Sequence, residues 1–264
     1  MLRDDIRAYY ARGGERDRLR DGLGRLEFLR TWDILERELP DAPAQLLDVG
    51  GATGVYAGPL AEAGYDVRLI DPIPEQVAVA ATLVGVRAEV GDVRDLPVRD
   101  ASVDAVLLLG PLYHLLDRAD RVRAFREAHR VVRPGGAIIA ATINRYASLF
   151  DAFAKGYSTD PEFMAILDRT MATGRHRGTA DGRYFTSAYF HEPMEAAEEA
   201  REAGLTVVKV VAVESPLWMS GAQIVATLDD PAQVSHLIRL LREVEQEPTL
   251  LGASSHVITV ARRP

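Results

Sequence analysis

A glycine-rich turn between an apolar run and a helix-like segment is the strongest chemical signal in the sequence. Residues 47–54 read LDVGGATG. Glycines let the backbone approach a ligand closely, and the N-terminus of the following helix offers free N–H groups. We therefore expect a nucleotide-like cofactor at this turn, with Asp48, Gly50, Gly51 and Gly54 around it.

A nicotinamide dinucleotide fits this turn less well. Its fingerprint needs glycines at the first, third and sixth positions. Counting from Gly50 places Ala52 and Val55 at the third and sixth positions. An oxidoreductase is therefore a weaker alternative.

A carboxylate ends the second apolar run, about twenty residues after the turn, where dinucleotide-binding folds keep a ribose ligand. Asp71, followed by Pro72, can accept two hydrogen bonds from vicinal hydroxyls. Alone it could also be a turn residue. Its distance from the glycine turn favours the role of ribose ligand.

These segments, in this order, resemble the core of class I methyltransferases that depend on S-adenosylmethionine (SAM). Residues 46–139 match that core in order and spacing, with Ala52 where the family usually has its middle glycine. One extra methyl group should be tolerable if the backbone there does not need a positive φ. The resemblance implies SAM as cofactor and S-adenosylhomocysteine as product.

The resemblance also assigns cofactor contacts to later segments. Asp92 and Val93 would border the adenine, and Leu109 and Gly110 would hold the methionine portion of SAM. Short segments of this kind are weak signals alone, because glycine–aspartate pairs occur in many turns.

Tyr113 and His114 follow the fourth apolar run, at the edge where open α/β sheets carry their sites. We expect both to contact the methyl acceptor. A histidine near neutrality can remove a proton during transfer, so His114 is the candidate base, with a packed loop histidine as the alternative.

The N-terminal part offers further cofactor contacts. Arg25 or Arg30 could pair with the methionine carboxylate, although a surface arginine is the commoner case. Tyr9 and Tyr10 could close over the sulfonium with their aromatic faces, or pack in the core.

Residues 144–203 mix aromatic, glycine and charged residues without a useful strand-like run, which indicates an inserted helical lid. Tyr184, Tyr189 and His191 are its candidate acceptor contacts, with ordinary packing as the alternative. The same two interpretations apply to His256. Segments 24–31, 184–191 and 247–252 also resemble an uncharacterised bacterial subgroup of small-molecule methyltransferases, which brings no substrate with it.

Short apolar runs alternate with helix-period segments, which predicts βαβ units. We expect an α/β fold: a seven-stranded, mainly parallel Rossmann-like sheet with helices on both faces. The predicted strands cover residues 46–49, 67–70, 86–90, 103–109, 137–141, 206–213 and 256–261. One structural domain would comprise a helical extension (1–40), a SAM-binding core (41–143), the lid (144–203) and the last two strands (204–264).

Composition limits the partners. The 264 residues carry a net charge of −8 and no cysteine. These values favour a small acceptor over nucleic acid or an anionic membrane, and we expect a cytoplasmic monomer or homodimer. The six histidines are scattered, so no metal is expected. RNA or protein methylation and a non-catalytic SAM-binding module stay open as alternatives.

Overall fold

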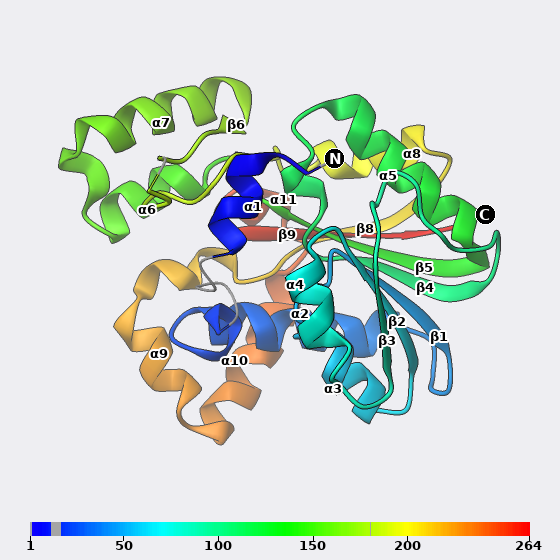
Figure 1. Cartoon of the computed structure of the whole chain (residues 1–264). Helices are drawn as coiled ribbons and strands as arrows, with labels where there is room; N and C mark the ends of the chain where they lie inside the picture. Colours follow the sequence, from blue (N-terminus) through cyan, green and yellow to red (C-terminus); the bar gives the residue numbers. More distant parts are fainter. Residues whose placement is uncertain (1, 12–16, 180) are drawn as a thin grey trace.

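One seven-stranded sheet organises the molecule (Figure 1). The computed structural model describes residues 2–11, 17–179 and 181–264. The strand order is β3-β2-β1-β4-β5-β9-β8, and every pairing is parallel except those of β9. The strands are β1 (Gln45–Val49), β2 (Asp66–Asp71), β3 (Val86–Val90), β4 (Val103–Leu108), β5 (Val132–Ile143), β8 (Thr206–Ala212) and β9 (His256–Arg262). The predicted seven-stranded, mainly parallel sheet is confirmed.

Helices cover both faces of this sheet, as expected. Successive side chains of a strand point to opposite faces. Leu46 and Leu69 therefore pack toward α2 (Gly24–Glu38), α3 (Ala57–Glu62) and α4 (Pro74–Ala80). Leu47 and Ile70 pack toward α5 (Arg118–Val131) and α8 (Glu195–Glu202). Figure 1 shows the two helical layers above and below the sheet.

The fifth strand begins earlier than predicted. Helix α5 ends at Val131 and β5 starts at the next residue, whereas the sequence indicated a strand from Ala137. Val132 pairs with Val103, and the register then shifts before Ala105 pairs with Ala137. Residues 133–136, Arg-Pro-Gly-Gly, therefore lie in an irregular first part of β5.

The N-terminal extension consists of separate pieces. Helix α1 (Asp4–Tyr10) and the short 3-10 helix η1 (Arg18–Arg20) precede α2. The Ser187 hydroxyl donates to the Asp5 carboxylate, and the rings of Tyr9 and Phe185 lie 5.2 Å apart. Helix α1 thus contacts the inserted segment.

The inserted segment has its own small core. It contains α6 (Ala147–Ala154), η3 (Tyr157–Thr159), α7 (Pro161–Thr173) and a hairpin of β6 (Arg175–His176) and β7 (Ala188–Tyr189), which the sequence did not indicate. Phe163, Ile166 and Tyr184 pack together within it. Helix α8 also lies before residue 203, but its Ala196 and Ala200 join the main core beside α5. The part of the predicted lid (144–203) that packs apart from the main core therefore ends before α8.

A helical segment also separates β8 from β9. It contains η4 (Ser215–Ser220), α9 (Ala222–Leu228), α10 (Pro231–Val244) and α11 (Pro248–Leu251). Ile224 and Leu237 pack against Leu26 of α2. Within the described ranges, no helix combines the length and apolarity needed to cross a membrane.

A buried ion network joins α2 to this segment. The guanidinium of Arg30, fully buried, pairs with Asp33 and donates to Glu245 at 2.8 Å and to the Val213 carbonyl at 3.0 Å. Arg37 donates to the same Glu245 carboxylate at 2.7 Å. These bonds fix α2 beside the end of β8.

We expect Glu245→Ala to lower the free energy of unfolding by about 3 kcal/mol, because it removes one of the two carboxylates that pair with buried Arg30 and also the partner of Arg37. Glu243→Ala is the matched control, since Glu243 is exposed in the last turn of α10, the helix that Glu245 follows. Urea denaturation measures both. Equal stabilities of the two variants would contradict a structural role for the network.

Candidate active site

A cavity of about 420 Å³ opens over the carboxyl ends of the parallel strands. It is lined in turn by Gly50 after β1, Asp71 at the end of β2, Asp92 after β3 and Gly110 after β4. His256 also lines it, because antiparallel β9 begins at the edge where the other strands end. Ligands of open α/β sheets bind in this position.

Two glycines let the turns after β1 and β4 touch. Gly50 has φ +71°, and a Cβ there would lie 2.9 Å from the Pro111 ring. A Cβ on Gly110 would lie 3.0 Å from the Gly50 carbonyl oxygen. Gly51 also lines the cavity. Gly54, which was expected to contact the cofactor, does not line the cavity. A Cβ at this position would meet Leu83, so the small size of Gly54 serves packing.

Ala52 has φ +50°, in the left-handed region. The methyl group of Ala52 was expected to be tolerable only if the backbone there does not need a positive φ, and this condition is not met. The conformation costs roughly 1 kcal/mol for a residue with a Cβ. The Ala52 N–H donates to Asp71 Oδ2 at 3.0 Å, which helps to hold the turn.

Asp48 and Asp71 form an acidic pair beneath the turn. Asp71 also accepts a hydrogen bond from the Ile73 N–H at 2.9 Å, yet burial raises its pKa to about 6. Asp48 is buried, and its Oδ2 has no hydrogen-bond partner among the described residues. Burial and the charge of Asp71 raise the pKa of Asp48 to about 7. A cationic or hydrogen-bond-donating ligand would stabilise both carboxylates.

Asp92 and Val93 line the cavity at the end of β3, as does Pro72 after β2. Arg94 donates to Asp92 at 2.6 and 2.8 Å and to Asp120 at 2.7 Å. Its hydrogen bonds lower the pKa of Asp92 to about 2. The Asp92 carboxylate is thus ionised and fixed.

Tyr10 and His114 meet above the cavity. His114, in the 3-10 helix η2 (Leu112–His114), is joined through Nε2 to the Tyr10 hydroxyl at 2.7 Å. Burial lowers the pKa of His114 to about 4, against the opposing effects of the Ser187 backbone and Asp5. Tyr113 and Leu109 are lining residues too. His114 therefore attaches α1 to the strand edge, and this geometry does not support a role as base.

The two upstream arginines lie away from the cavity. Arg25 donates to Asp229 at 2.6 Å and to the Leu228 carbonyl at 2.5 Å, and is not a lining residue. Arg30 is committed to its buried network. The structure brings neither to the position expected for a carboxylate ligand, because both face the segment between β8 and β9.

The lid residues chosen as acceptor contacts also lie outside the cavity lining. The Tyr184 hydroxyl donates to Asp160 at 2.5 Å, within the small core of the lid. The Tyr189 ring lies 3.7 Å from the Arg121 guanidinium, and His191 lies 3.6 Å from Glu199. These side chains serve packing and buried polar contacts instead.

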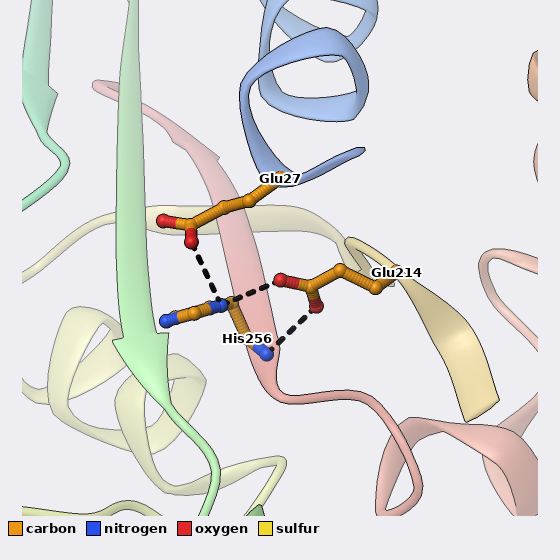
Figure 2. A group of neighbouring side chains, drawn as sticks. All are labelled: Glu27, Glu214 and His256. Carbon is orange, nitrogen blue, oxygen red and sulfur yellow. Dashed lines mark hydrogen bonds and ion pairs between the residues drawn. The ribbon is translucent and has the colours of Figure 1, made fainter. Parts of the chain in front are cut away.

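A cluster that the sequence did not assemble lies at the other end of the cavity. Figure 2 shows Glu27 of α2, Glu214 after β8 and His256 converging from three elements. His256 Nδ1 lies 2.6 Å from Glu214 Oε1 and 3.7 Å from Glu27 Oε2. The signal that could have found it is positional: Glu214 follows one edge strand and His256 begins the adjacent one.

Charges around this cluster set its protonation. Burial alone would lower the pKa of His256. The carboxylates of Glu27 and Glu214 outweigh burial and raise this pKa to about 9. Burial would raise the pKa of Glu27, but the positive charges of His256 and Arg18 outweigh burial and lower this pKa. The three ligand-type atoms lie within 4.8 Å of one another, close enough to surround a small cation. In the structure the same atoms are engaged otherwise. His256 Nδ1 and Glu214 Oε1 share a proton, and Glu27 Oε2 pairs with Arg18.

A family model described as a methyltransferase domain matches residues 47–140. An uncharacterized methyltransferase of Mycobacterium tuberculosis is 43% identical over 38% of this chain and 40% of the relative. A ubiquinone biosynthesis O-methyltransferase of Methylocella silvestris is 34% identical over 61% of this chain and 58% of the relative. The chain thus spans less than two thirds of these relatives.

The fold is shared more widely than the sequence. A SAM-dependent methyltransferase of Thermotoga maritima, described as a possible histamine N-methyltransferase, aligns with a TM-score of 0.61 over 98% of this chain and 99% of that one. Its sequence identity of 18% supports the fold alone. The domain match and the relatives identify residues 47–140 as a methyltransferase domain, and the fold is that of class I SAM-dependent methyltransferases.

Proposed function

We propose that the chain transfers the methyl group of SAM to a nucleophilic O, N, S or C atom of a small molecule and releases S-adenosylhomocysteine. One observation carries the proposal: a single cavity runs from the glycine turn and Asp71 to the Glu27–Glu214–His256 cluster. It therefore has a cofactor end and a polar far end. Much of the rate would come from placing the nucleophile in line with the sulfonium methyl group.

The cofactor end supplies contacts for each part of SAM. Asp71 would accept hydrogen bonds from the ribose, and Asp92 with Val93 would border the adenine. The turn at Gly50 and Gly51 brings backbone close to the methionine portion. The sulfonium is a cation, and the acidic pair of Asp48 and Asp71 favours a positive ligand by simple attraction.

The cover of the cavity supports a small acceptor. Leu2, Arg3, Ile6 and Tyr10 line it from the N-terminal segment, and Arg175 does so from the lid. A net charge of −8 disfavours broad contact with RNA. The name of the ubiquinone biosynthesis O-methyltransferase relative also points to a small acceptor. Release of S-adenosylhomocysteine with a pool of small hydroxyl and amine compounds would separate catalysis from mere SAM binding.

Replacing Asp71 by alanine should weaken SAM binding about tenfold or more, because charge-assisted hydrogen bonds to the ribose are lost. Asp66→Ala is the control: Asp66 begins the same strand, with an exposed partner in Arg87. Isothermal calorimetry measures both. An Asp71→Ala affinity within about twofold of the parent would refute the ribose assignment.

Asp48→Asn should stabilise the ligand-free protein, because its raised pKa means that the ionised carboxylate disfavours folding. The cost is absent below the unfolded pKa, grows as pH rises and is complete above about pH 7. At pH 8 the gain should be roughly 2–4 kcal/mol larger than at pH 4. Urea denaturation at both pH values, with Asp66→Asn as control, tests this, and a gain independent of pH would count against it.

Bound S-adenosylhomocysteine should slow hydrogen exchange in α1, since Ile6 and Tyr10 face the cavity. Helix α7 serves as the internal comparison, because its buried residues pack within the lid. Mass spectrometry of exchange resolves both segments. Protection of α7 with an unchanged α1 would instead make the lid the moving cover.

A further inference from the structure

We propose that His256, oriented by Glu214, accepts a proton from the methyl acceptor, so that the acceptor carries a protic nucleophile, a hydroxyl or an amine. This inference rests on the proposed function and narrows its substrate class. It assigns a role to the far end of the cavity, where the methyltransferase resemblance supplies no residue.

Glu214 is held rigidly for this task. Its Oε2 accepts hydrogen bonds from the Ser254 hydroxyl at 2.9 Å and the His256 N–H at 3.0 Å. The Ser254 oxygen in turn accepts from the N–H groups of Glu214 and Ser215, at 3.1 Å each. The carboxylate therefore has its orientation fixed by the backbone at the ends of both edge strands.

This carboxylate selects the imidazole tautomer. An ionised carboxylate only accepts hydrogen bonds, so the 2.6 Å contact places a proton on His256 Nδ1. In neutral His256 the lone pair then belongs to Nε2. Figure 2 shows this atom on the side of the ring turned away from Glu214, and the residue lines the cavity. A base oriented by a carboxylate is the arrangement that proton abstraction needs.

The sheet places the dyad at a suitable distance from the cofactor end. His256 pairs with Ile143 of β5, and β9 lies two strands beyond β4. At about 4.8 Å between strands, roughly 10 Å separates His256 from the loop at Gly110. That span accommodates a single-ring acceptor between a sulfonium held near Gly110 and Nε2.

The charges around His256 are ordered for this step. Glu214 and Glu27 face the ring from β8 and α2, Arg18 from η1 opposes them, and the Tyr56 phenol lies near the same carboxylates. The two carboxylates stabilise the imidazolium that forms. The positive sulfonium of bound SAM works in the opposite direction and increases the neutral fraction of His256. Because the pKa of His256 is about 9 in the free protein, the ring accepts the proton mainly at alkaline pH.

The reaction balances in atoms and charge. The lone pair of the acceptor oxygen or nitrogen forms a bond to the methyl carbon as the carbon–sulfur bond breaks. The electron pair of that bond passes to sulfur, which becomes the neutral thioether of S-adenosylhomocysteine. The proton of the acceptor goes to His256 Nε2, so the positive charge moves from sulfur to an imidazolium beside Glu214 and Glu27.

The other histidine of the cavity does not compete for this role. His114 Nε2 is engaged by the Tyr10 hydroxyl at 2.7 Å, and no carboxylate contacts its ring among the described hydrogen bonds and ion pairs. Of the two lining histidines, His256 alone has one ring nitrogen held by a fixed carboxylate and the other turned away from that carboxylate.

Nuclear magnetic resonance of protein labelled in its histidine imidazoles tests the proposal without a known acceptor. His256→Gln assigns the resonance, and exposed His236 of α10 is the internal control. In the free protein and with S-adenosylhomocysteine, His256 should titrate near pH 9. With SAM its pKa should fall by at least about half a pH unit, as expected for a positive charge within about 10 Å. The neutral ring should carry its proton on Nδ1.

Two variants separate orientation from charge. Glu27→Gln should lower the pKa of His256 and preserve the Nδ1–H tautomer, whereas Glu214→Gln should lower the pKa and lose that tautomer preference. Glu243→Gln, exposed on α10, should change neither. If Glu214→Gln does not fold, the tautomer in the parent and in Glu27→Gln still decides the point.

Each outcome has a distinct meaning. Equal His256 pKa values with SAM and S-adenosylhomocysteine, or a neutral ring protonated on Nε2, would overturn the inference while leaving SAM binding intact. If calorimetry finds that neither nucleotide binds, the proposed function fails as well. Stoichiometric binding of Mn²⁺ or Zn²⁺ that removes the His256 titration would replace the proton-accepting role with a metal site.

Discussion

Burial of carboxylates along the open edge of the sheet is the constraint on which the structure depends. Ionised groups removed from water need a counter-charge. Asp33 and Glu245 pair with Arg30, Glu199 pairs with Arg121, and Glu214 pairs with His256. In the part of the chain that the structure describes, buried Asp48 and Asp71 have no cationic partner. The cofactor end is therefore the place where a positive ligand completes the charge balance.

Much of this arrangement follows from local sequence. Period-two alternation in the strands separates the two helical layers, and residues that end parallel strands must meet at one edge. The glycine turn, Asp71, Asp92 and Gly110 could be placed in one cavity on these grounds. The left-handed conformation of Ala52 could not be predicted from the sequence, because an alanine gives no sign of a positive φ.

Long-range pairing explains the contacts that the sequence did not reveal. Arg25 and Arg30 are suitable carboxylate ligands by type, but their partners lie near the segment between β8 and β9, about two hundred positions away. The aromatic density of the lid likewise forms an internal core around Phe163, while the short helix α1 covers the cavity. His256 was visible as a candidate, but Glu27 and Glu214 become its neighbours only in three dimensions.

The central claim is that the unpaired acidic groups at Asp48 and Asp71 receive the positively charged cofactor. Calorimetry of SAM binding at pH 6, in two buffers with different ionisation enthalpies, measures the protons exchanged. With pKa values of about 7 and about 6, these groups are partly protonated there, whereas His256 is fully protonated. The account predicts release of roughly 1.4 protons on binding as both carboxylates ionise, about 0.9 from Asp48 and about 0.5 from Asp71. Binding without proton release, or with proton uptake, would contradict it.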